Sequence, residues 1–380
     1  MSQSAIAEPG YTAARERPPS SVAGPWAWAR TNLFGSWWST ALTLALGYVI
    51  LSIAVSFIGW AFVHAVWTVP YNPQGVPDTA SCLKMQGIGA CWAVIADKYR
   101  LILFGRYPYA EQWRPASCVA LFIALYVVSG IRRFWRKELA LIWVATLVVI
   151  GILMWGGVFG LPLVPEDEWG GLPITLILAT FGLAFAFPLA ILVALGRRST
   201  TLPAVHLLCV LYVELIRGVP LVALLFMASV MFPLFLPEGV NIDNLLRVQI
   251  AIILFVAAYV AEVIRAGLQA LPKGQTEAAE ALGLTYWQKT GFIILPQALR
   301  LVIPPLVNTC IGFFKDTSLV LIVGMFDLLM MGKVALSDPP WQNFANEVYI
   351  MLALIYIAFC FAMSKYSRGL ERDLGRAQRR

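Results

Sequence analysis

The chain has few charged residues and almost no histidine. Only 13% of its 380 residues are Asp, Glu, Lys or Arg, and only two are His. A typical soluble domain carries about 25% charged residues and about 50% apolar ones. With 59% hydrophobic residues, the chain cannot be a soluble globular domain, and its composition indicates an integral membrane protein.

Several kinds of chemical site are also missing. His64 and His206 stand alone near the ends of apolar segments, and the sequence offers no Ser/His/Asp arrangement and no metal-ligand cluster. A phosphate-binding P-loop needs Gly-Lys followed by Ser or Thr, but the only Gly-Lys pair, Gly332–Lys333, precedes Val334. The basic residues lie beside apolar segments, which argues against nucleic-acid binding. We therefore expect neither an enzyme nor an ATPase, and no cofactor on this chain.

Long apolar runs account for the composition. A helix that crosses a bilayer needs about 20 mostly apolar residues. Charge-free runs of about that length are Trp38–Val63, Pro115–Ile131, Leu139–Leu161, Leu172–Gly196, Gly218–Leu236 and Val348–Ser364. Two more runs contain charge: Val248–Ala261, which continues past Glu262 and Arg265, and Leu301–Phe326, which contains Lys315 and Asp316. Because no run alternates like a barrel strand, we expect an all-α membrane protein with about eight transmembrane helices.

Basic residues predict the orientation, since Lys and Arg accumulate in short cytoplasmic loops. Their clusters are Arg132–Lys137, Arg197–Arg198 and Lys365–Arg380. A cytoplasmic N-terminus places all three clusters, and both termini, in the cytoplasm. Loop 64–114 then lies outside, although long loops translocate largely regardless of charge. Its basic residues are Lys84, Lys98, Arg100, Arg106 and Arg114.

The chain divides into four parts. Residues 1–37 are rich in Pro, Ser, Ala and Gly, so we expect a disordered cytoplasmic tail there. Residues 38–165 form a three-helix extension with the outer loop 64–114, residues 166–366 a five-helix core, and residues 367–380 a basic cytoplasmic tail. Cys82 and Cys91 lie in the outer loop, where a disulfide can persist. Their spacing does not match a zinc site, and the bridged and free states both remain open.

A polar, helix-forming segment, Glu277–Pro296, interrupts the apolar core. Thr276 is placed to cap a first helix that has Glu277 and Glu280 in its first turn. Gly283 is placed to end that helix in the left-handed conformation. Thr285–Gln288 reads as a capping box for a second short helix, which must stop before Pro296.

This segment resembles the cytoplasmic coupling loop of permease subunits of bacterial binding-protein-dependent ABC importers. The family pattern is Glu-Ala-Ala, three residues, Gly and a downstream Ile-x-Leu-Pro. Here it is Glu277, Ala278, Ala279, Gly283, Ile293, Leu295 and Pro296. The resemblance implies that loop 271–297 seats a helix on a separate ATPase. The residues implied in this coupling are Glu277, Ala278, Ala279, Glu280, Ala281, Leu282 and Gly283.

The resemblance covers Trp169 to about Lys365 and implies the function. The implied protein moves L-amino acids across the bacterial inner membrane into the cytoplasm by alternating access, as a subunit of an ATP-driven importer. The implied partners are a second, homologous permease subunit in a heterodimer, a homodimeric ATPase that holds ATP and Mg²⁺, a periplasmic amino-acid-binding protein, and membrane lipids. With three helices before the core, the chain looks like the larger membrane subunit of a general L-amino-acid transporter. The alternative is an ion-coupled secondary transporter or channel without an ATPase.

Charged residues lie at the ends of two core segments. Glu214 and Arg217, in YVELIRGVP, share a helical face at i, i+3, and the family shows this pattern at the same place. We expect Pro220 to start the next helix. Glu262 and Arg265 repeat the spacing one helix later. We interpret both pairs as structural ion pairs.

Lys315 and Asp316 lie between two apolar stretches. Ionisable residues inside a membrane usually face a bundle interior or a cavity, and Thr317 and Ser318 add hydroxyls that can bind a zwitterion. Family permeases for polar amino acids carry a similar Lys-Asp-Thr-Ser-Leu run. The candidate substrate-pathway residues are Lys315, Asp316, Thr317, Ser318, Asn308 and Glu262. The other interpretation is that Lys315 and Asp316 neutralise each other at a helix break.

Overall fold

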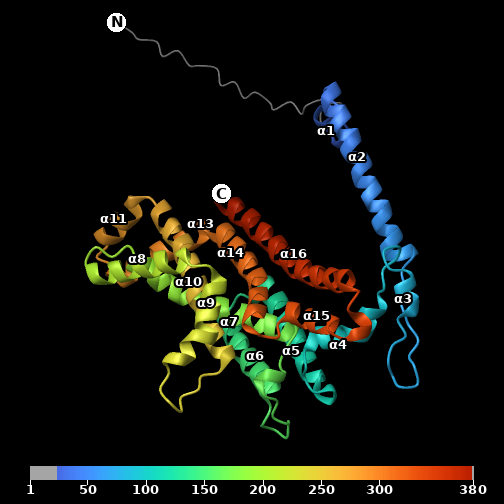
Figure 1. Cartoon of the computed structure of the whole chain (residues 1–380). Coiled ribbons are helices and arrows are strands. Elements are labelled where there is room, and N and C mark those ends of the chain that lie inside the picture. Colours follow the sequence, from blue (N-terminus) through green and yellow to red (C-terminus); the bar gives the residue numbers. More distant parts are fainter. Residues whose placement is uncertain (1–23, 379–380) are drawn as a thin grey trace. The chain divides into compact units, whose positions relative to one another are not determined.

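Helices account for the regular secondary structure of residues 24–378, the part of the chain that the computed structural model describes (Figure 1). Seven of these helices are long and apolar enough to cross a membrane, or up to eight if a bent pair counts as one span. The predicted all-α membrane fold is therefore confirmed. These spans are built on α2 (Trp37–Ile58), α5 (Trp113–Gly130), α6 (Lys137–Trp155), α7 (Leu172–Gly196), α10 (Asn244–Ala270), α14 (Ile303–Asp316), which the following 3-10 turn extends to Val323, and α16 (Ala345–Gln378).

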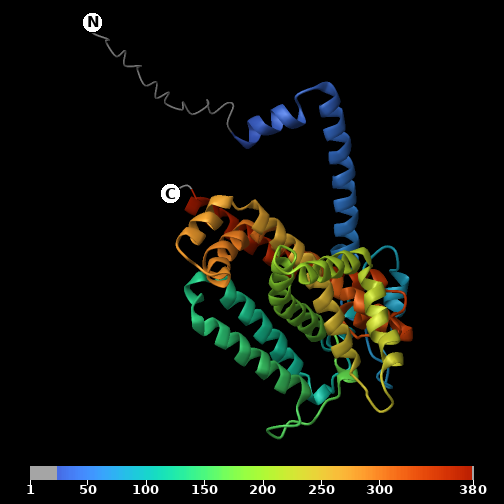
Figure 2. The same ribbon diagram turned by 90° about the vertical axis from the view of Figure 1, so that its left-hand side faces the viewer.

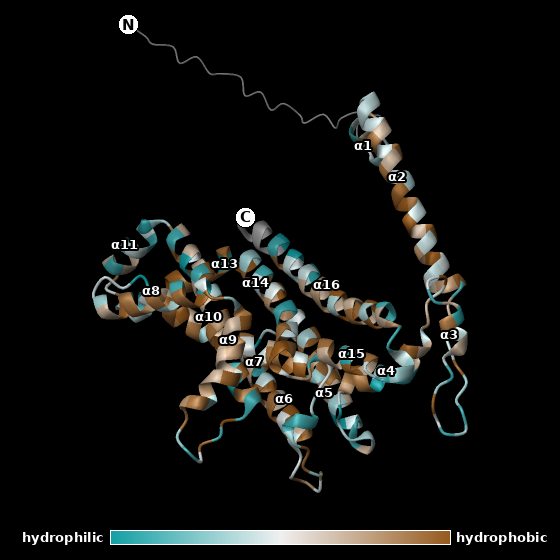
Figure 3. Cartoon of the chain, in the orientation of Figure 1, coloured by the Kyte–Doolittle hydropathy of each residue, from teal (hydrophilic) through white to brown (hydrophobic). Residues whose placement is uncertain are grey.

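Shorter elements connect or extend these helices. The remaining α-helices are α1 (Pro25–Leu33), α3 (Ala80–Lys84), α4 (Ala93–Phe104), α8 (Pro203–Gly218), α9 (Leu221–Phe226), α11 (Lys273–Ala281), α12 (Tyr286–Gln288), α13 (Leu295–Leu301) and α15 (Leu328–Leu336). The π-helical turns are η1 (Gly59–Val63), η5 (Met227–Met231) and η7 (Lys289–Ile294). The 3-10 turns are η2 (Tyr109–Glu111), η3 (Arg132–Phe134), η4 (Glu166–Glu168), η6 (Phe232–Phe235), η8 (Thr317–Val323) and η9 (Pro339–Trp341). In Figure 3 the hydrophilic colour marks α11 and the C-terminal part of α16.

Contacts divide the chain into two compact units. One unit holds residues 24–66 and Ser81–Ala90, and the other holds Trp67–Ala80 and the chain from Cys91 onward. This division does not follow the predicted boundary at residue 166, because α4, α5 and α6 belong to the same unit as the core. Hydropathy identifies the spans but not which of them pack together.

The first unit is built on α2. Ser36 begins this helix by accepting a hydrogen bond from the Ser39 N–H at 3.2 Å, and apolar residues then cover all its sides. Helix α1 lies within the segment predicted to be a disordered tail, so that prediction is wrong for Pro25–Leu33. Pro25 helps this helix to form, because proline is favourable in a first helical turn. The rest of the predicted tail up to residue 23 lies outside the described residues.

The second unit is built around α7, α10 and α14. A Cβ atom added to Gly182 of α7 would lie 2.8 Å from Ile252 of α10 and 2.9 Å from Phe313 of α14. Only glycine permits this approach of three helices, since it has no Cβ. On the other side of α14, the Phe314 ring lies 5.6 Å from the ring of Tyr356, on α16.

The extension packs tightly within this unit. Helices α5 and α6 run side by side (Figure 2), and the fully buried Arg114 of α5 fixes the end of α6. Its guanidinium donates to the carbonyl oxygens of Leu153 at 2.6 Å and Pro162 at 2.9 Å.

In the core, the Asp327 carboxylate caps α15 by accepting from the N–H groups of Leu329 and Met330. These polar contacts satisfy buried groups that would otherwise be costly.

A sharp bend separates α8 from α9. Val219 has extended backbone angles and Pro220 caps α9, as expected for a residue that precedes proline. The axes of α8 and of the segment Leu221–Phe235 differ by 103°. Pro220 therefore stands immediately before the next helix, as predicted. The predicted span Gly218–Leu236 is the second half of this bent pair.

Residues 367–378, in the predicted basic tail, continue helix α16. Helix α16 extends to Gln378, and residues 379–380 lie outside the described part of the chain. Within it the Ser367 hydroxyl donates to Glu371 at 3.0 Å, a contact between neighbours on one helical face.

Candidate coupling loop and translocation helices

Helix α11 begins earlier than the sequence pattern predicts. Pro272 stands at its N-cap and Lys273 begins it, so Thr276 lies inside the helix. The predicted cap at Thr276 is wrong, and so is the placement of Glu277 and Glu280 in the first turn. The reason is Pro272, whose fixed φ prepares the chain for a helix without a capping hydroxyl.

Gly283 ends α11 as predicted. Its φ is 72°, the left-handed region that glycine adopts without strain. The Leu284 N–H donates to the Ala279 carbonyl at 3.2 Å, and the Gly283 N–H donates to the Glu280 carbonyl at 2.9 Å. Together these bonds form a Schellman motif, which satisfies the last carbonyls of the helix and turns the chain sharply.

The second helix of the loop begins with the predicted capping box. The Gln288 N–H donates to the Thr285 hydroxyl, and the Thr285 N–H donates to the Gln288 side chain at 3.0 Å. Helix α12 ends at Gln288, before Pro296 as predicted, but the chain continues through the π-helical turn η7 into α13, which has Pro296 in its first turn. A proline is tolerated there because the first N–H groups of a helix need no partner within it.

The loop presents large apolar side chains on a polar segment. The exposed fractions are 77% for Leu282, 69% for Trp287 and 79% for Phe292. Each of these three side chains is therefore accessible to a neighbouring molecule. Of the predicted coupling residues, Ala279 is buried, and the others are exposed: Glu277, Ala278, Glu280, Ala281, Leu282 and Gly283. Glu280 also forms an ion pair with Lys289, which joins α11 to η7.

Charged side chains converge where α10 approaches the loop. Glu262 pairs with Arg265, as predicted, through the Arg265 Nε at 3.0 Å. Its Oε2 also accepts from the Arg197 Nη1 at 2.8 Å and lies 4.0 Å from the Arg217 Nη1. Because arginines occupy both carboxylate oxygens, Glu262 is not free to meet a substrate, and its assignment to the substrate pathway is not supported.

The predicted pair of Glu214 with Arg217 is wrong for the described structure. Glu214 instead accepts from the Arg197 Nη2 at 2.9 Å. Arg197 caps the end of α7, and so stands between α8 and α10. Helical spacing shows which residues share a face, but it does not show that a residue from another helix will take the carboxylate. The feature of the sequence that could have indicated this partner was the basic cluster Arg197–Arg198.

The other substrate-pathway candidates separate into two groups. Asn308 and Lys315 are exposed on one face of α14, and Asp316 is partly exposed beside them. Thr317 is fully buried, and its hydroxyl donates to the Phe314 carbonyl at 2.7 Å. Its predicted exposure to a substrate is therefore not supported. The Ser318 hydroxyl donates to the Lys315 carbonyl at 2.8 Å, where α14 gives way to the 3-10 turn η8.

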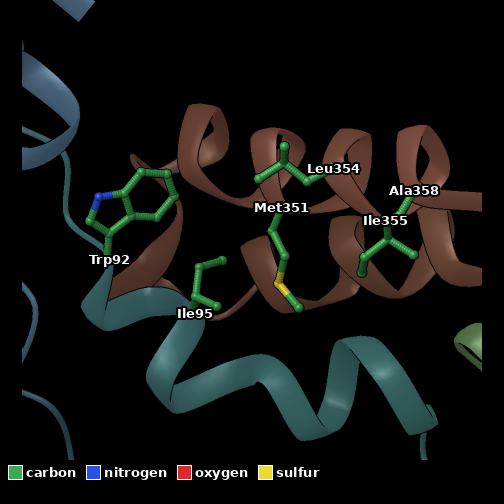
Figure 4. Close-up of a pocket in the computed structure, with 6 residues that line it drawn as sticks. All are labelled: Trp92, Ile95, Met351, Leu354, Ile355 and Ala358. Carbon is green, nitrogen blue, oxygen red and sulfur yellow. The ribbon is translucent and has the colours of Figure 1, made fainter. Parts of the chain in front are cut away.

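Two hollows differ in character. An apolar one of about 400 Å³ lies between α4 and α16 (Figure 4). Its lining is Trp92, Ile95, Met351, Leu354, Ile355 and Ala358, which offers a zwitterion no polar partner. The other, of about 170 Å³, lies at the end of α10 away from the coupling loop and includes Glu166 and Asp243. Burial and the hydrogen bond with Asp243 raise the pKa of Glu166 to about 7.

Lys98, one of the basic residues of loop 64–114, has partners that the sequence did not reveal. The Lys98 Nζ lies 2.6 Å from the Asp338 carboxylate and 3.1 Å from that of Asp97. Asp97 also accepts hydrogen bonds from the Tyr71 hydroxyl and the Trp341 indole N–H, each at 2.8 Å. This network joins α4 to η9, and it gives Lys98 a structural role in a loop that orientation rules place outside.

The cysteines fall into two classes. Cys82 and Cys91 are both disulfide-bonded and buried. The free cysteines are Cys118, Cys209, Cys310 and Cys360. They lie in long apolar segments, where cysteine behaves as a small hydrophobic residue.

Comparison with known proteins identifies the family. The model of the binding-protein-dependent transport system inner membrane component matches residues 186–376. The chain is 46% identical over 351 residues to YhdY of Escherichia coli K12, an inner membrane amino-acid ABC transporter permease protein, with 91% of this chain and 92% of YhdY covered. This chain belongs to the family of inner membrane components of binding-protein-dependent transport systems.

Two further similarities were found. BztC of Rhodobacter capsulatus, a glutamate/glutamine/aspartate/asparagine transport system permease protein, is 37% identical over 437 aligned positions, with all of both chains covered. A chain in the crystal structure of an amino acid ABC transporter with histidines is 32% identical with a TM-score of 0.47, over 53% of this chain and 92% of that one. The BztC alignment includes the N-terminal extension as well as the core.

Proposed function

We propose that this chain is the permease subunit of an ATP-driven ABC importer that moves L-amino acids from the periplasm to the cytoplasm by alternating access. Membership of the family and the similarity to amino-acid permeases such as YhdY support this function. The observation that carries it is the loop at α11, where the Schellman motif at Gly283 ends the helix between the exposed side chains of Leu282 and Trp287. A self-sufficient carrier would have no use for such a surface.

The proposed assembly contains further chains. A homodimeric ATPase holds ATP and Mg²⁺ and receives α11, a second, homologous permease completes a heterodimer, and a periplasmic protein delivers the amino acid. The N-terminal extension supports assignment as the larger of the two permeases. Both termini lie in the cytoplasm in this proposal, because the basic clusters at Arg197 and in the last turns of α16 follow the positive-inside rule.

The proposed substrate path includes the exposed polar face of α14. Asn308 and Lys315 lie about 10 Å apart along the helix axis, from the 1.5 Å rise per residue. Polar side chains on a transmembrane helix face a partner or a water-filled path rather than lipid. A broad amino-acid carrier must contact the shared α-amino and α-carboxylate groups, and Lys315 and Asp316 supply charges of both signs for them.

The test compares two glycines of the loop. Gly283→Val places a β-branched side chain at φ 72°, whereas Gly274→Val places it in the same loop, in open space and without positive φ. We expect Gly283→Val to abolish ATP-dependent uptake at unchanged membrane abundance and Gly274→Val to retain it. Normal uptake in Gly283→Val would remove the loop from the mechanism and favour the ion-coupled carrier.

A further inference from the structure

The cluster formed by Glu262, Arg197, Glu214, Arg217 and Arg265 joins three helices of the core at their coupling-loop ends. We propose that Glu262 is a positioning residue, which makes α7 and α8 follow the coupling loop when the ATPase changes state. This inference rests on the proposed function, because it needs a loop that transmits motion from an ATPase.

The position of Glu262 suits this role. It lies about two turns before Ala270, the last residue of α10, and only Leu271 and Pro272 separate α10 from α11. Helix α13, which follows the loop, packs against the same end of α10. A Cβ on Gly267 of α10 would lie 2.8 Å from the Ala298 carbonyl oxygen of α13. The end of α10 is thus attached to both sides of the loop, and it moves when the loop moves.

Arg197 extends the attachment to α7 and α8. It is 11% exposed and bridges two carboxylates, Glu262 of α10 at 2.8 Å and Glu214 of α8 at 2.9 Å. The neighbouring Arg198 donates to the Leu268 carbonyl at 3.1 Å. The end of α7 is therefore held to α10 at two points. Helix α8 is held through Arg197 and also by the Tyr212 hydroxyl, which donates to the Leu254 carbonyl of α10 at 2.5 Å.

The bend after α8 connects this attachment to a second helical segment. Helix α8 continues past the 103° bend into α9, η5 and η6. A displacement of Glu214 by Arg197 turns α8, and the turn is passed to this segment. The cluster is thus a route from the ATPase surface to this helix pair, in addition to the direct packing of α8 and α9 on α10.

Charge balance explains why Glu262 is central. Three guanidinium groups converge on this one carboxylate, whereas Glu214 meets a single arginine and is 61% exposed. Loss of the Glu262 charge leaves like charges close together, which then separate. Partly exposed ion pairs contribute little to stability. The loss is therefore expected to change the arrangement of the helix ends more than the stability of the fold.

The experiment uses the assembled transporter in proteoliposomes with Glu262→Gln, Glu262→Asp, Glu214→Gln and Gly283→Val. The measured quantities are the ATP hydrolysed per amino acid transported and the thermal unfolding midpoint. We expect Glu262→Gln to raise the ATP ratio at least fivefold with the midpoint nearly unchanged. Glu262→Asp, which keeps the charge, is expected to stay within twofold of the parent protein, and Glu214→Gln to lie between the two.

Each other outcome overturns the inference. A normal ratio in Glu262→Gln, with or without a lower midpoint, means that the cluster is only structural. An equal rise in Glu262→Gln and Glu262→Asp means that the charge is not what positions α7 and α8. If Glu262→Gln is normal while Gly283→Val loses uptake, the proposed function survives. If Gly283→Val also transports normally, the proposed function fails as well.

Discussion

Helices α7, α10 and α14 meet at Gly182, so we expect a larger side chain at this position to destabilise the fold. In Gly182→Val the Cβ would lie 2.8 Å from Ile252 and 2.9 Å from Phe313, closer than side-chain atoms normally approach. Overpacking of this kind costs about 1 to 3 kcal/mol. Because proteins are only about 5 to 15 kcal/mol more stable than their unfolded chains, the loss is measurable. We expect a lower thermal unfolding midpoint in detergent and lower abundance in the membrane.

The control for this substitution is Gly47→Val. Gly47 also lies inside an apolar helix, α2, but a Cβ there meets nothing within 4 Å. The intrinsic change in helix propensity is the same for both variants, so the difference between their midpoints measures the packing. Equal midpoints for Gly182→Val and Gly47→Val would refute the close approach of the three helices.

Three further predictions follow from the loop, from α14 and from the acidic hollow. Thr285→Ala removes the capping box and should destabilise α12 by about 1 kcal/mol, seen as faster amide exchange in Tyr286–Gln288; unchanged exchange would contradict the cap. Asn308→Ala and Lys315→Ala should each reduce uptake of acidic, neutral and basic amino acids alike, by about 5- to 150-fold for a lost contact of about 1 to 3 kcal/mol; a loss confined to one charge class would move the site. Because the pKa of Glu166 is raised from 4.5 to about 7, the folded state keeps its proton over a pH range in which the unfolded chain has lost it, so stability should fall as pH rises from 4.5 to about 7. Glu166→Gln should flatten this dependence of the unfolding midpoint.

Local chemistry made the coupling loop predictable. Gly283 and the Thr285 capping box depend on residues within a few positions of one another, so the sequence alone predicts their geometry. The start of α11 was misplaced because both Pro272 and Thr276 are competent helix starters, and only the folded chain shows which is used. The sequence did not show that a new helix, α13, follows the π-helical turn η7 and has Pro296 in its first turn.

Contacts between distant segments were not predictable in the same way. The Glu214 carboxylate had a suitable partner three residues away, yet Arg197 from α7 takes it. The network of Asp97 with Trp341 joins residues more than 200 positions apart, and no spacing rule reaches that far. Likewise Thr317 has a polar side chain in a polar run, but its burial depends on how η8 packs.

The most direct test of the proposed importer is transport by a purified, reconstituted complex. Co-purify this chain with its partners, reconstitute them in proteoliposomes, and measure uptake of labelled L-amino acids delivered by the binding protein, with and without ATP and Mg²⁺ on the ATPase side. The proposed function predicts co-purification with an ATPase chain and uptake that requires ATP, and Gly283→Val should abolish that uptake. Uptake driven by an ion gradient without ATP, or full activity of this chain with no ATPase present, would contradict it.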